Sequence, residues 1–189
     1  MPCERFQFVV GGGWVEFDIR DKWSSPEVGV VARVTALHYE DTGISFYDFT
    51  RIIGDVKGYI PLGKRNRILA LRLYTSQSEP QEGKSVPFYL METLGGAADI
   101  RGYREYRFRD TRNLLVSAEY RWEILPYADM TVFFDAGKVF RDRKDFNFDK
   151  MHTGYGIGLR AHSANFVLRL DLAQSLEGFR FHIGGGPSF

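Results

Sequence analysis

The chain of 189 residues has little of what marks a metal enzyme, a disulfide-rich domain or a helical membrane protein. Cys3 is its only cysteine, so neither a disulfide framework nor a thiolate metal site is available. No run of about 18 apolar residues occurs, which excludes a transmembrane helix. The 25 Lys and Arg residues balance 24 Asp and Glu residues. Without a net basic field, the composition gives no reason to expect a nucleic-acid partner.

The histidines also lack the spacing of a metal or catalytic site. They are scattered at His38, His152, His162 and His182. No Ser/His/Asp set is supported by a nucleophile elbow. Glu119 and Asp135 could resemble a pair of catalytic carboxylates, but neighbouring arginines would hold both of them ionised. The sequence therefore predicts neither an enzyme, nor a cofactor, nor a metal site.

What the sequence does contain is alternation of apolar and polar residues with period two. Between Leu114 and Ile124, apolar side chains form one face, and Ser117, Glu119, Arg121 and Glu123 form the other. Similar runs predict nine strands and no helix. Their approximate ranges are 15–20, 28–40, 44–60, 69–74, 114–124, 127–137, 155–161, 168–172 and 179–189. The many glycines and aromatic residues suit strands and tight turns.

Two folds fit this alternation, because it does not say which face meets water. A soluble or periplasmic small-molecule-binding β-barrel would turn the apolar face inward, whereas a transmembrane β-barrel turns it to lipid. Several strands reach about ten residues, the length that crosses a bilayer at a tilt. Aromatic residues such as Tyr120, Trp122 and Tyr127 gather near strand ends, as in an interfacial girdle. These features favour an all-β, antiparallel transmembrane β-barrel, with the soluble barrel as the alternative.

The gaps between the predicted strands alternate in length. Long gaps lie at 77–112 and 138–151, and tight ones lie around Pro126 and Ser163-Ala164. Membrane barrels have short turns on the periplasmic side and long loops outside. On this topology the last strand ends on the periplasmic side and the first, near Trp14, begins outside. Because a barrel with an odd number of strands closes with a parallel pair, we expect missing N-terminal strands or a second copy to complete it.

The segment 77–112 is too long for an ordinary connection, since loops above about 12–15 residues are usually functional or disordered. It contains Gly95 and Gly96, which permit a tight reversal, and then Ile100-Arg101-Gly102-Tyr103. An arginine between apolar neighbours requires a planar anion if it is shielded from water. We therefore expect Arg101 to have a carboxylate partner; a solvated loop arginine is the alternative.

Asp135 is the candidate partner, because its alternation with Phe134 directs it into the lumen. Glu119 points the same way on the preceding strand. On the following strand, Gly156 and Gly158 would clear space for a loop to lie against the wall. A simple strand-end turn is the alternative interpretation of Asp135 followed by Gly137.

Six short motifs follow one another along the chain. They are Gly95-Gly96, Ile100-Arg101-Gly102-Tyr103, Glu119-Tyr120-Arg121, Phe133-x-Asp135-x-Gly137, Gly156-x-Gly158-Leu159-Arg160 and the terminal Phe189. In this order they resemble the bacterial surface antigen superfamily, which includes outer-membrane protein assembly factors of BamA and TamA type. The resemblance covers most of the chain and is strongest from Gly95 onwards.

The resemblance implies a barrel of about sixteen strands, of which residues 1–189 form the C-terminal outer-membrane domain in a Gram-negative-type cell. The loop would fold back into the lumen, and Arg101 would pair with Asp135. The implied function is to assist insertion or translocation of polypeptides, with outer-membrane lipid and client polypeptides or barrel precursors as partners. Phe179, Phe181 and Phe189 would belong to a C-terminal assembly signal; a core or edge position is the alternative for Phe189.

Overall fold

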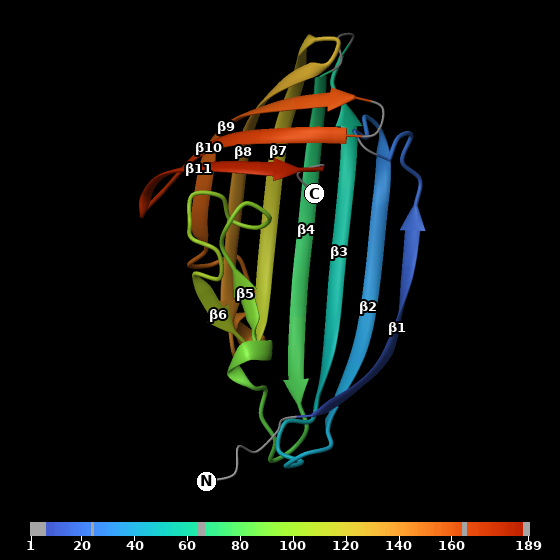
Figure 1. The fold of residues 1–189 in the computed structure, drawn as a ribbon, viewed down its shortest axis with the longest axis vertical. Coiled ribbons are helices and arrows are strands. Elements are labelled where there is room, and N and C mark those ends of the chain that lie inside the picture. The colour runs from blue at the N-terminus through green and yellow to red at the C-terminus, as the bar shows by residue number, and fades with distance from the viewer. Residues whose placement is uncertain (1–6, 24, 64–66, 164–165, 187–189) are drawn as a thin grey trace.

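The computed structural model describes residues 7–23, 25–63, 67–163 and 166–186, which form an antiparallel sheet of nine strands (Figure 1). The strands are β1 (Phe8–Asp18), β2 (Gly29–Asp41), β3 (Phe49–Pro61), β4 (Arg67–Pro80), β7 (Arg112–Leu125), β8 (Ala128–Phe140), β9 (His152–Ser163), β10 (Phe166–Ser175) and β11 (Gly178–Gly185). Each pairs with the next in this order. The predicted all-β, antiparallel fold of nine strands is therefore confirmed.

The predicted range of one strand begins earlier in the sequence than the strand itself. The range 44–60 was expected from its pattern of apolar and polar residues, but β3 starts at Phe49. The reason is the Asp41 carboxylate, which accepts hydrogen bonds from the backbone N–H groups of Gly43, Ile44 and Phe46. These bonds stabilise a turn in place of a strand ladder.

The long loop is also shorter than the predicted segment 77–112. Residues 78–80 still pair with β3, and the ladder between β4 and β7 continues to Gln77 and Arg112, so the connection is 81–111. It contains the 3₁₀ turn η1 (Phe88–Leu90) and a small hairpin of β5 (Glu92–Leu94) and β6 (Phe108–Asp110). We call residues 81–111 the lumenal loop.

The other connections follow the predicted alternation of long and short gaps only in part. A long connection, 141–151, contains the second 3₁₀ turn, η2 (Arg143–Asp145), and residues 126–127 make a tight turn. The turn expected at Ser163-Ala164 lies partly outside the described residues, and β9 continues to Ser163. In the part of the chain that the structure describes, no helix is long and apolar enough to cross a membrane.

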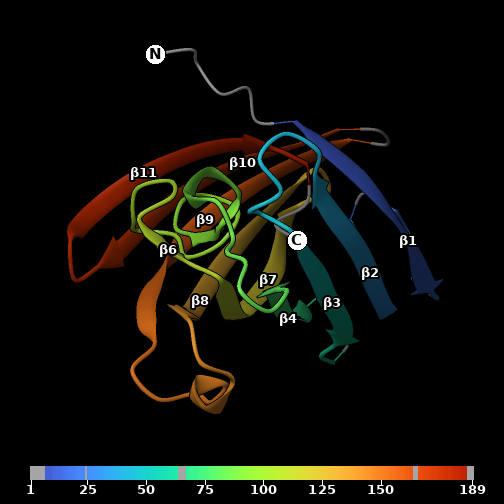
Figure 2. The ribbon, with the colours of Figure 1, turned by 90° about the horizontal axis from the view of Figure 1, so that it is seen from below.

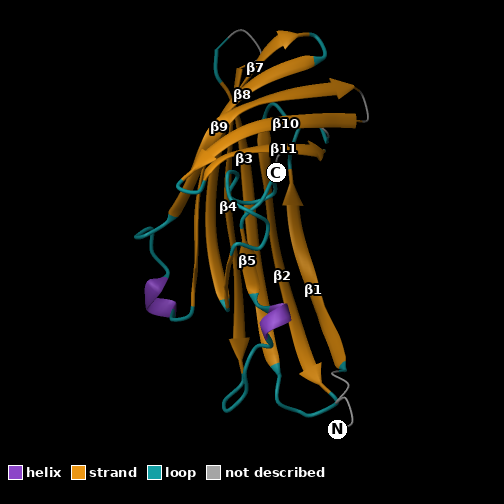
Figure 3. Cartoon of the chain, turned by 60° about the vertical axis from the view of Figure 1, so that its left-hand side comes forward, coloured by secondary structure: helices purple, strands orange, loops and turns teal. Residues whose placement is uncertain are grey.

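The sheet is open and curved around the lumenal loop. Figure 2 shows the loop on the concave side, and the same arrangement can be followed in Figure 3. In the sheet order, β1 and β11 each have only one neighbouring strand. The described strands therefore form a barrel wall with two unpaired edges rather than a closed barrel.

The two faces of the wall differ sharply in chemistry and exposure. On the convex face, Phe134 is 47% exposed and Ile157 is 51% exposed. On the concave face, Asp135 is fully buried and so is Glu119. The charged face is therefore inside and the apolar face outside, so the alternative of a barrel with an apolar interior is wrong. An outer surface of this kind suits lipid. We call the concave face the lumenal face.

Candidate functional site

Three glycines let the tip of the lumenal loop reverse direction. Gly95, Gly96 and Gly102 have φ angles of +119°, +104° and +97°. L-residues with a side chain rarely adopt this backbone region, whereas glycine adopts it without steric cost. The resulting turns present Ile100, Arg101 and Tyr103 to the wall, where all three are buried.

Arg101 is the centre of the contact between the loop and the wall. Its guanidinium donates to both carboxylate oxygens of Asp135, at 2.7 Å and 2.9 Å, and its backbone N–H donates to the same carboxylate at 3.2 Å. Nη1 also donates to Glu119 at 2.9 Å. The guanidinium lies over the ring of Phe133, with its Cζ 3.5 Å from the ring centroid. The ion pair implied by the family resemblance is present, with a second carboxylate beside it.

These contacts belong to a buried network of three arginines and three carboxylates. Glu119 also accepts hydrogen bonds from Arg121 at 2.8 Å and from Arg160 at 2.9 Å. Asp171 accepts one from Arg160 at 2.5 Å and lies 3.7 Å from Arg101. The formal charges of the six groups cancel, which makes their burial tolerable.

The charge state of Arg101 follows from its partners. Burial alone would lower the pKa of the Arg101 guanidinium, but the charge and hydrogen bonds of Asp135, with the charge of Glu119, raise it above its usual range. Arg101 is thus held as a permanent cation inside the wall. A proton-transfer role would need a group that changes its charge near neutral pH, so the arrangement suits bracing rather than acid–base chemistry.

The wall is shaped to receive the loop. A side chain at Gly154 would overlap the carbonyl oxygen of Arg101. A Cβ atom at Gly137 would lie 3.0 Å from side-chain atoms of Leu94 and Ile100. Leu94 and Ile100 pack with Tyr103 and Leu115 in a fully buried apolar cluster. The missing side chains at 137 and 154 therefore create the close approach.

Gly156 and Gly158 do not have the role predicted for them. The atoms nearest to a Cβ at Gly156 belong to β10 and to the ring of Phe133, and those nearest to a Cβ at Gly158 belong to Asp171, Arg160 and Thr131. Gly156 makes room for the backbone of β10 and the ring of Phe133, and Gly158 makes room for side chains of the wall itself. Gly154, which sequence reasoning did not select, lies against the loop.

A second anchor holds the base of the loop. Glu92 forms an ion pair of 2.6 Å with Arg51 on β3 and accepts a hydrogen bond of 2.9 Å from Ser78 on β4. Sequence reasoning missed this contact, because nothing in the local pattern links a loop glutamate to a strand so far upstream. The loop is thus fixed at both its base and its tip.

The tip also contacts the last hairpin. Ser175 on β10 donates to the carbonyl oxygen of Gly102 at 2.8 Å, and the Gly102 N–H donates to Nε2 of His182 on β11 at 3.2 Å. Arg107 pairs with Glu177 in the turn between these strands. Alternation within each strand could not predict these contacts with the loop.

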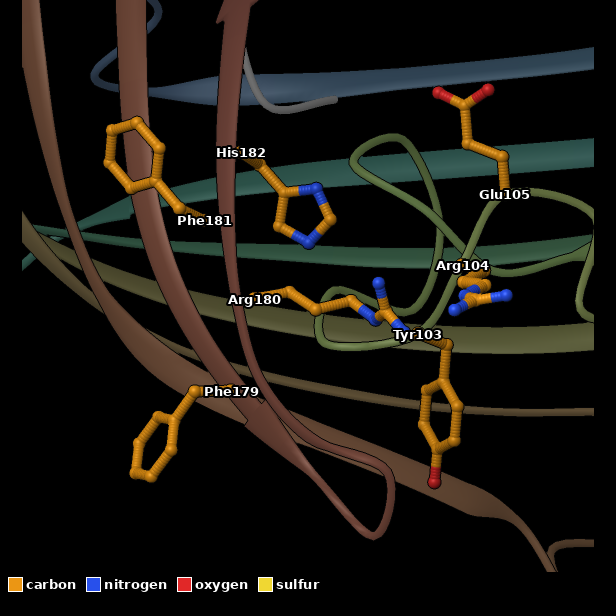
Figure 4. A pocket seen from close by; sticks show the side chains of 7 residues that line it. All are labelled: Tyr103, Arg104, Glu105, Phe179, Arg180, Phe181 and His182. Carbon is orange, nitrogen blue, oxygen red and sulfur yellow. The ribbon is translucent and has the colours of Figure 1, made fainter.

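The C-terminal aromatic residues lie elsewhere. Phe179 and Phe181 are exposed on the convex face of β11, and Figure 4 shows them pointing away from the side of Arg180 and His182. Phe189 lies outside the described residues.

Among the described residues, no group of three or more His, Cys, Asp or Glu side chains could hold a metal ion.

Comparison with known proteins agrees with this geometry. The Omp85 superfamily domain matches residues 4–189. Among solved structures, the chain is similar to BamA from Haemophilus ducreyi, crystallised without POTRA domains 1-3, with a TM-score of 0.74 and 17% identity. The match covers 90% of this chain but only 41% of the BamA chain, so this chain spans less than half of the length of that BamA chain. At this identity the likeness shows a shared fold. No curated protein matches.

The family match extends over nearly the whole chain, and the similar structure shares the fold over 90% of it. Together they confirm the family predicted from the motifs and associate the chain with outer-membrane assembly and translocation proteins of BamA and TamA type. The chain belongs to the Omp85 superfamily.

Proposed function

We propose that this chain forms the C-terminal part of an outer-membrane barrel that assists the insertion or translocation of polypeptides. The observation that carries this proposal is the contrast between a rigidly braced lumen and an unpaired edge. The lumenal loop is locked to the wall through Arg101, while β11 has a neighbour on one side only. A stiff wall next to an open edge is suited to receive an added strand.

The mechanism is physical. An exposed strand edge presents unpaired N–H and C=O groups, which template pairing with an incoming strand. In lipid an unpaired backbone group costs several kcal/mol, so pairing at the edge lowers the barrier for a client strand to leave water. The braced loop keeps the last strands in register while the edge is open. No covalent bond is made or broken in this process, and we infer a non-enzymatic role.

The partners follow from the two exposed features. The convex face is apolar on β8, β9 and β11, with Phe134, Ile157 and Phe181 among its exposed residues, and outer-membrane lipid would cover it. The edges would pair with client strands or barrel precursors, and with further N-terminal strands or a second copy when the barrel is closed. We accordingly assign the chain to the outer membrane of a Gram-negative-type cell.

Reconstitution tests this proposal. Proteoliposomes with the chain should accelerate insertion of an unfolded barrel client, measured by its heat-modifiable electrophoretic mobility. Arg101→Ala and Asp135→Ala should slow insertion to similar extents, and the double variant should be no worse than either single one, because both remove the same contact. Arg141→Ala, at an exposed loop arginine, is the matched control.

Two outcomes would contradict the proposal. Insertion no faster than into empty liposomes would overturn the assigned function. Strictly additive losses in the double variant would overturn the role of the Arg101–Asp135 contact and leave the function itself standing.

A further inference from the structure

The lumenal face of the last hairpin has more positive than negative groups. The register between β10 and β11 places Arg169 opposite Gly184, Asp171 opposite His182 and Ala173 opposite Arg180. Asp171 is the one acidic residue on this face of the two described strands, and it is bound to Arg160 at 2.5 Å. Arg169 and Arg180 therefore lack a carboxylate of their own on the hairpin's lumenal face.

Arg169 is buried in spite of this. The residue is 8% exposed, and in the described part of the chain its Nε and Nη1 atoms have no hydrogen-bond partner. A guanidinium normally enters a protein interior only with an anion, because desolvating the charge costs several kcal/mol. Its position thus indicates a site that is incomplete without a further group.

The missing group can be located from the neighbouring glycine. A Cβ atom at Gly184 would lie 3.0 Å from Nη2 and 3.3 Å from Nε of Arg169, so the guanidinium lies directly over the glycine. Gly184 belongs to β11, the edge strand. A strand added at this edge would lie about 4.8 Å further on. Because glycine has no side chain in between, a carboxylate opposite Gly184 on the added strand would meet the guanidinium.

Arg180 marks a second basic position on the same face of β11, four residues before Gly184. It lines a cavity of about 450 Å³ with Tyr103, Glu105 and His182 (Figure 4). Its Nε has no hydrogen-bond partner among the described residues. Its Nη2 forms only a long ion pair of 4.0 Å with Glu177, which also pairs with Arg107. An added strand would therefore meet two cations four residues apart on one face.

The opposite edge of the sheet offers no such site. On β1, Glu16 is paired with Arg33 and Asp18 with Arg20. These charges are already matched within the chain. Of the two edges, the one at β11 therefore carries the buried arginine that lacks a hydrogen-bonded carboxylate among the described residues.

We propose that Arg169, with Arg180, selects an antiparallel polypeptide strand whose lumenal face carries a carboxylate opposite Gly184. This inference rests on the proposed function, since it names the chemistry of the strand that the edge receives. Backbone pairing would supply affinity for any strand, and the bidentate guanidinium–carboxylate contact would supply selectivity and register.

Binding of two synthetic peptides tests the site. Both are fluorescent ten-residue strands of alternating apolar and polar residues. One carries Glu at two lumenal positions four residues apart, and the other carries Gln there. Anisotropy with the full chain in detergent micelles should show about tenfold tighter binding of the Glu peptide. Arg169→Gln should remove this preference, and Arg33→Gln, at a lumenal arginine paired with Glu16, should keep it.

The outcomes separate the inference from the function. If both peptides bind the wild-type chain equally, the acidic selectivity is overturned while strand addition stands, and this comparison needs no variant to fold. If neither binds, strand addition at the edge fails, and the inference fails with it. A Glu preference that survives Arg169→Gln would place recognition elsewhere and overturn the role of Arg169.

Discussion

The lumenal faces of β1–β4 and of β7–β11 carry charged residues with the same alternation, yet they use them differently. In the first region the Arg33–Glu16 pair is open to solvent, with side chains 48% and 21% exposed. In the second the Arg101–Glu119 pair is 3% and 0% exposed. The difference arises from the lumenal loop, which lies on the concave side (Figure 2) and contacts β7, β8 and β10 through Arg101 and Gly102.

This contrast shows that the sequence pattern of charged residues does not determine how much an ion pair contributes to stability. Burial of the pair determines it. An exposed ion pair contributes about 0–1 kcal/mol, because water and salt screen it. A buried network contributes little net stability when complete, but loss of one member leaves an uncompensated charge and costs about 3–5 kcal/mol. By covering these side chains, the loop turns charges that would otherwise be exposed into a buried network. We call this network the lock; it consists of Arg101, Arg121, Arg160, Glu119, Asp135 and Asp171.

Of the substitutions in the two regions, removal of Glu119 should lower the stability of the fold most. Glu119 accepts hydrogen bonds from three arginines, and Glu119→Ala leaves three buried cations facing two carboxylates. We expect the free energy of unfolding to fall by about 3–5 kcal/mol, measured by urea titration in micelles with tryptophan fluorescence. Glu16→Ala, the equivalent loss on β1, is the matched control. Equal losses in the two variants would show that burial by the loop does not distinguish the two regions.

The strands of both regions could be predicted from the sequence, because alternation with period two is a local property of each strand. The lock was predictable only in part. The pairing of Arg101 with Asp135 followed from a motif resemblance, and Glu119 and Arg160 were expected on the wall. The contact of Asp171 with Arg160 was not predicted.

The remaining contacts depend on register and on the path of the loop. Ser175 and His182 meet Gly102 because the loop tip lies against both β10 and β11. A shift of one residue in either strand would turn these side chains outward. The anchor between Glu92 and Arg51 depends in the same way on how β5 sits beside β3 and β4. Such contacts follow from three-dimensional placement, which no local pattern contains.

Asp99 lies in the lumenal loop, but it is not one of the six residues of the buried network around Arg101. Burial raises the pKa of Asp99 from 3.8 to about 6; the charge of Arg72 opposes the rise, and that of Asp135 adds to it. Between about pH 4 and pH 6 the folded state thus binds more protons than the unfolded state, so the free energy of unfolding falls as pH rises.

Asp99→Asn should remove this slope and raise the free energy of unfolding above pH 6 by on the order of 2 kcal/mol. Urea titrations from pH 4 to pH 8 measure it, and Asp142→Asn, at an exposed loop carboxylate, should leave the slope in place. A steeper slope in Asp99→Asn would mean that the buried carboxylate is stabilised in its charged form.

The smallest effect is expected where the lumen is open. Arg33 pairs with Glu16 at 2.6 Å and lies over the ring of Trp14. Although this contact is as short as those of Arg101, its exposure leaves water as an alternative partner for both charges. Arg33→Gln should therefore change the free energy of unfolding by less than about 1 kcal/mol, and 0.5 M salt should shrink the difference further. A loss of several kcal/mol in the free energy of unfolding would mean that another segment covers this face in solution. Both regions would then be covered, each by a different segment.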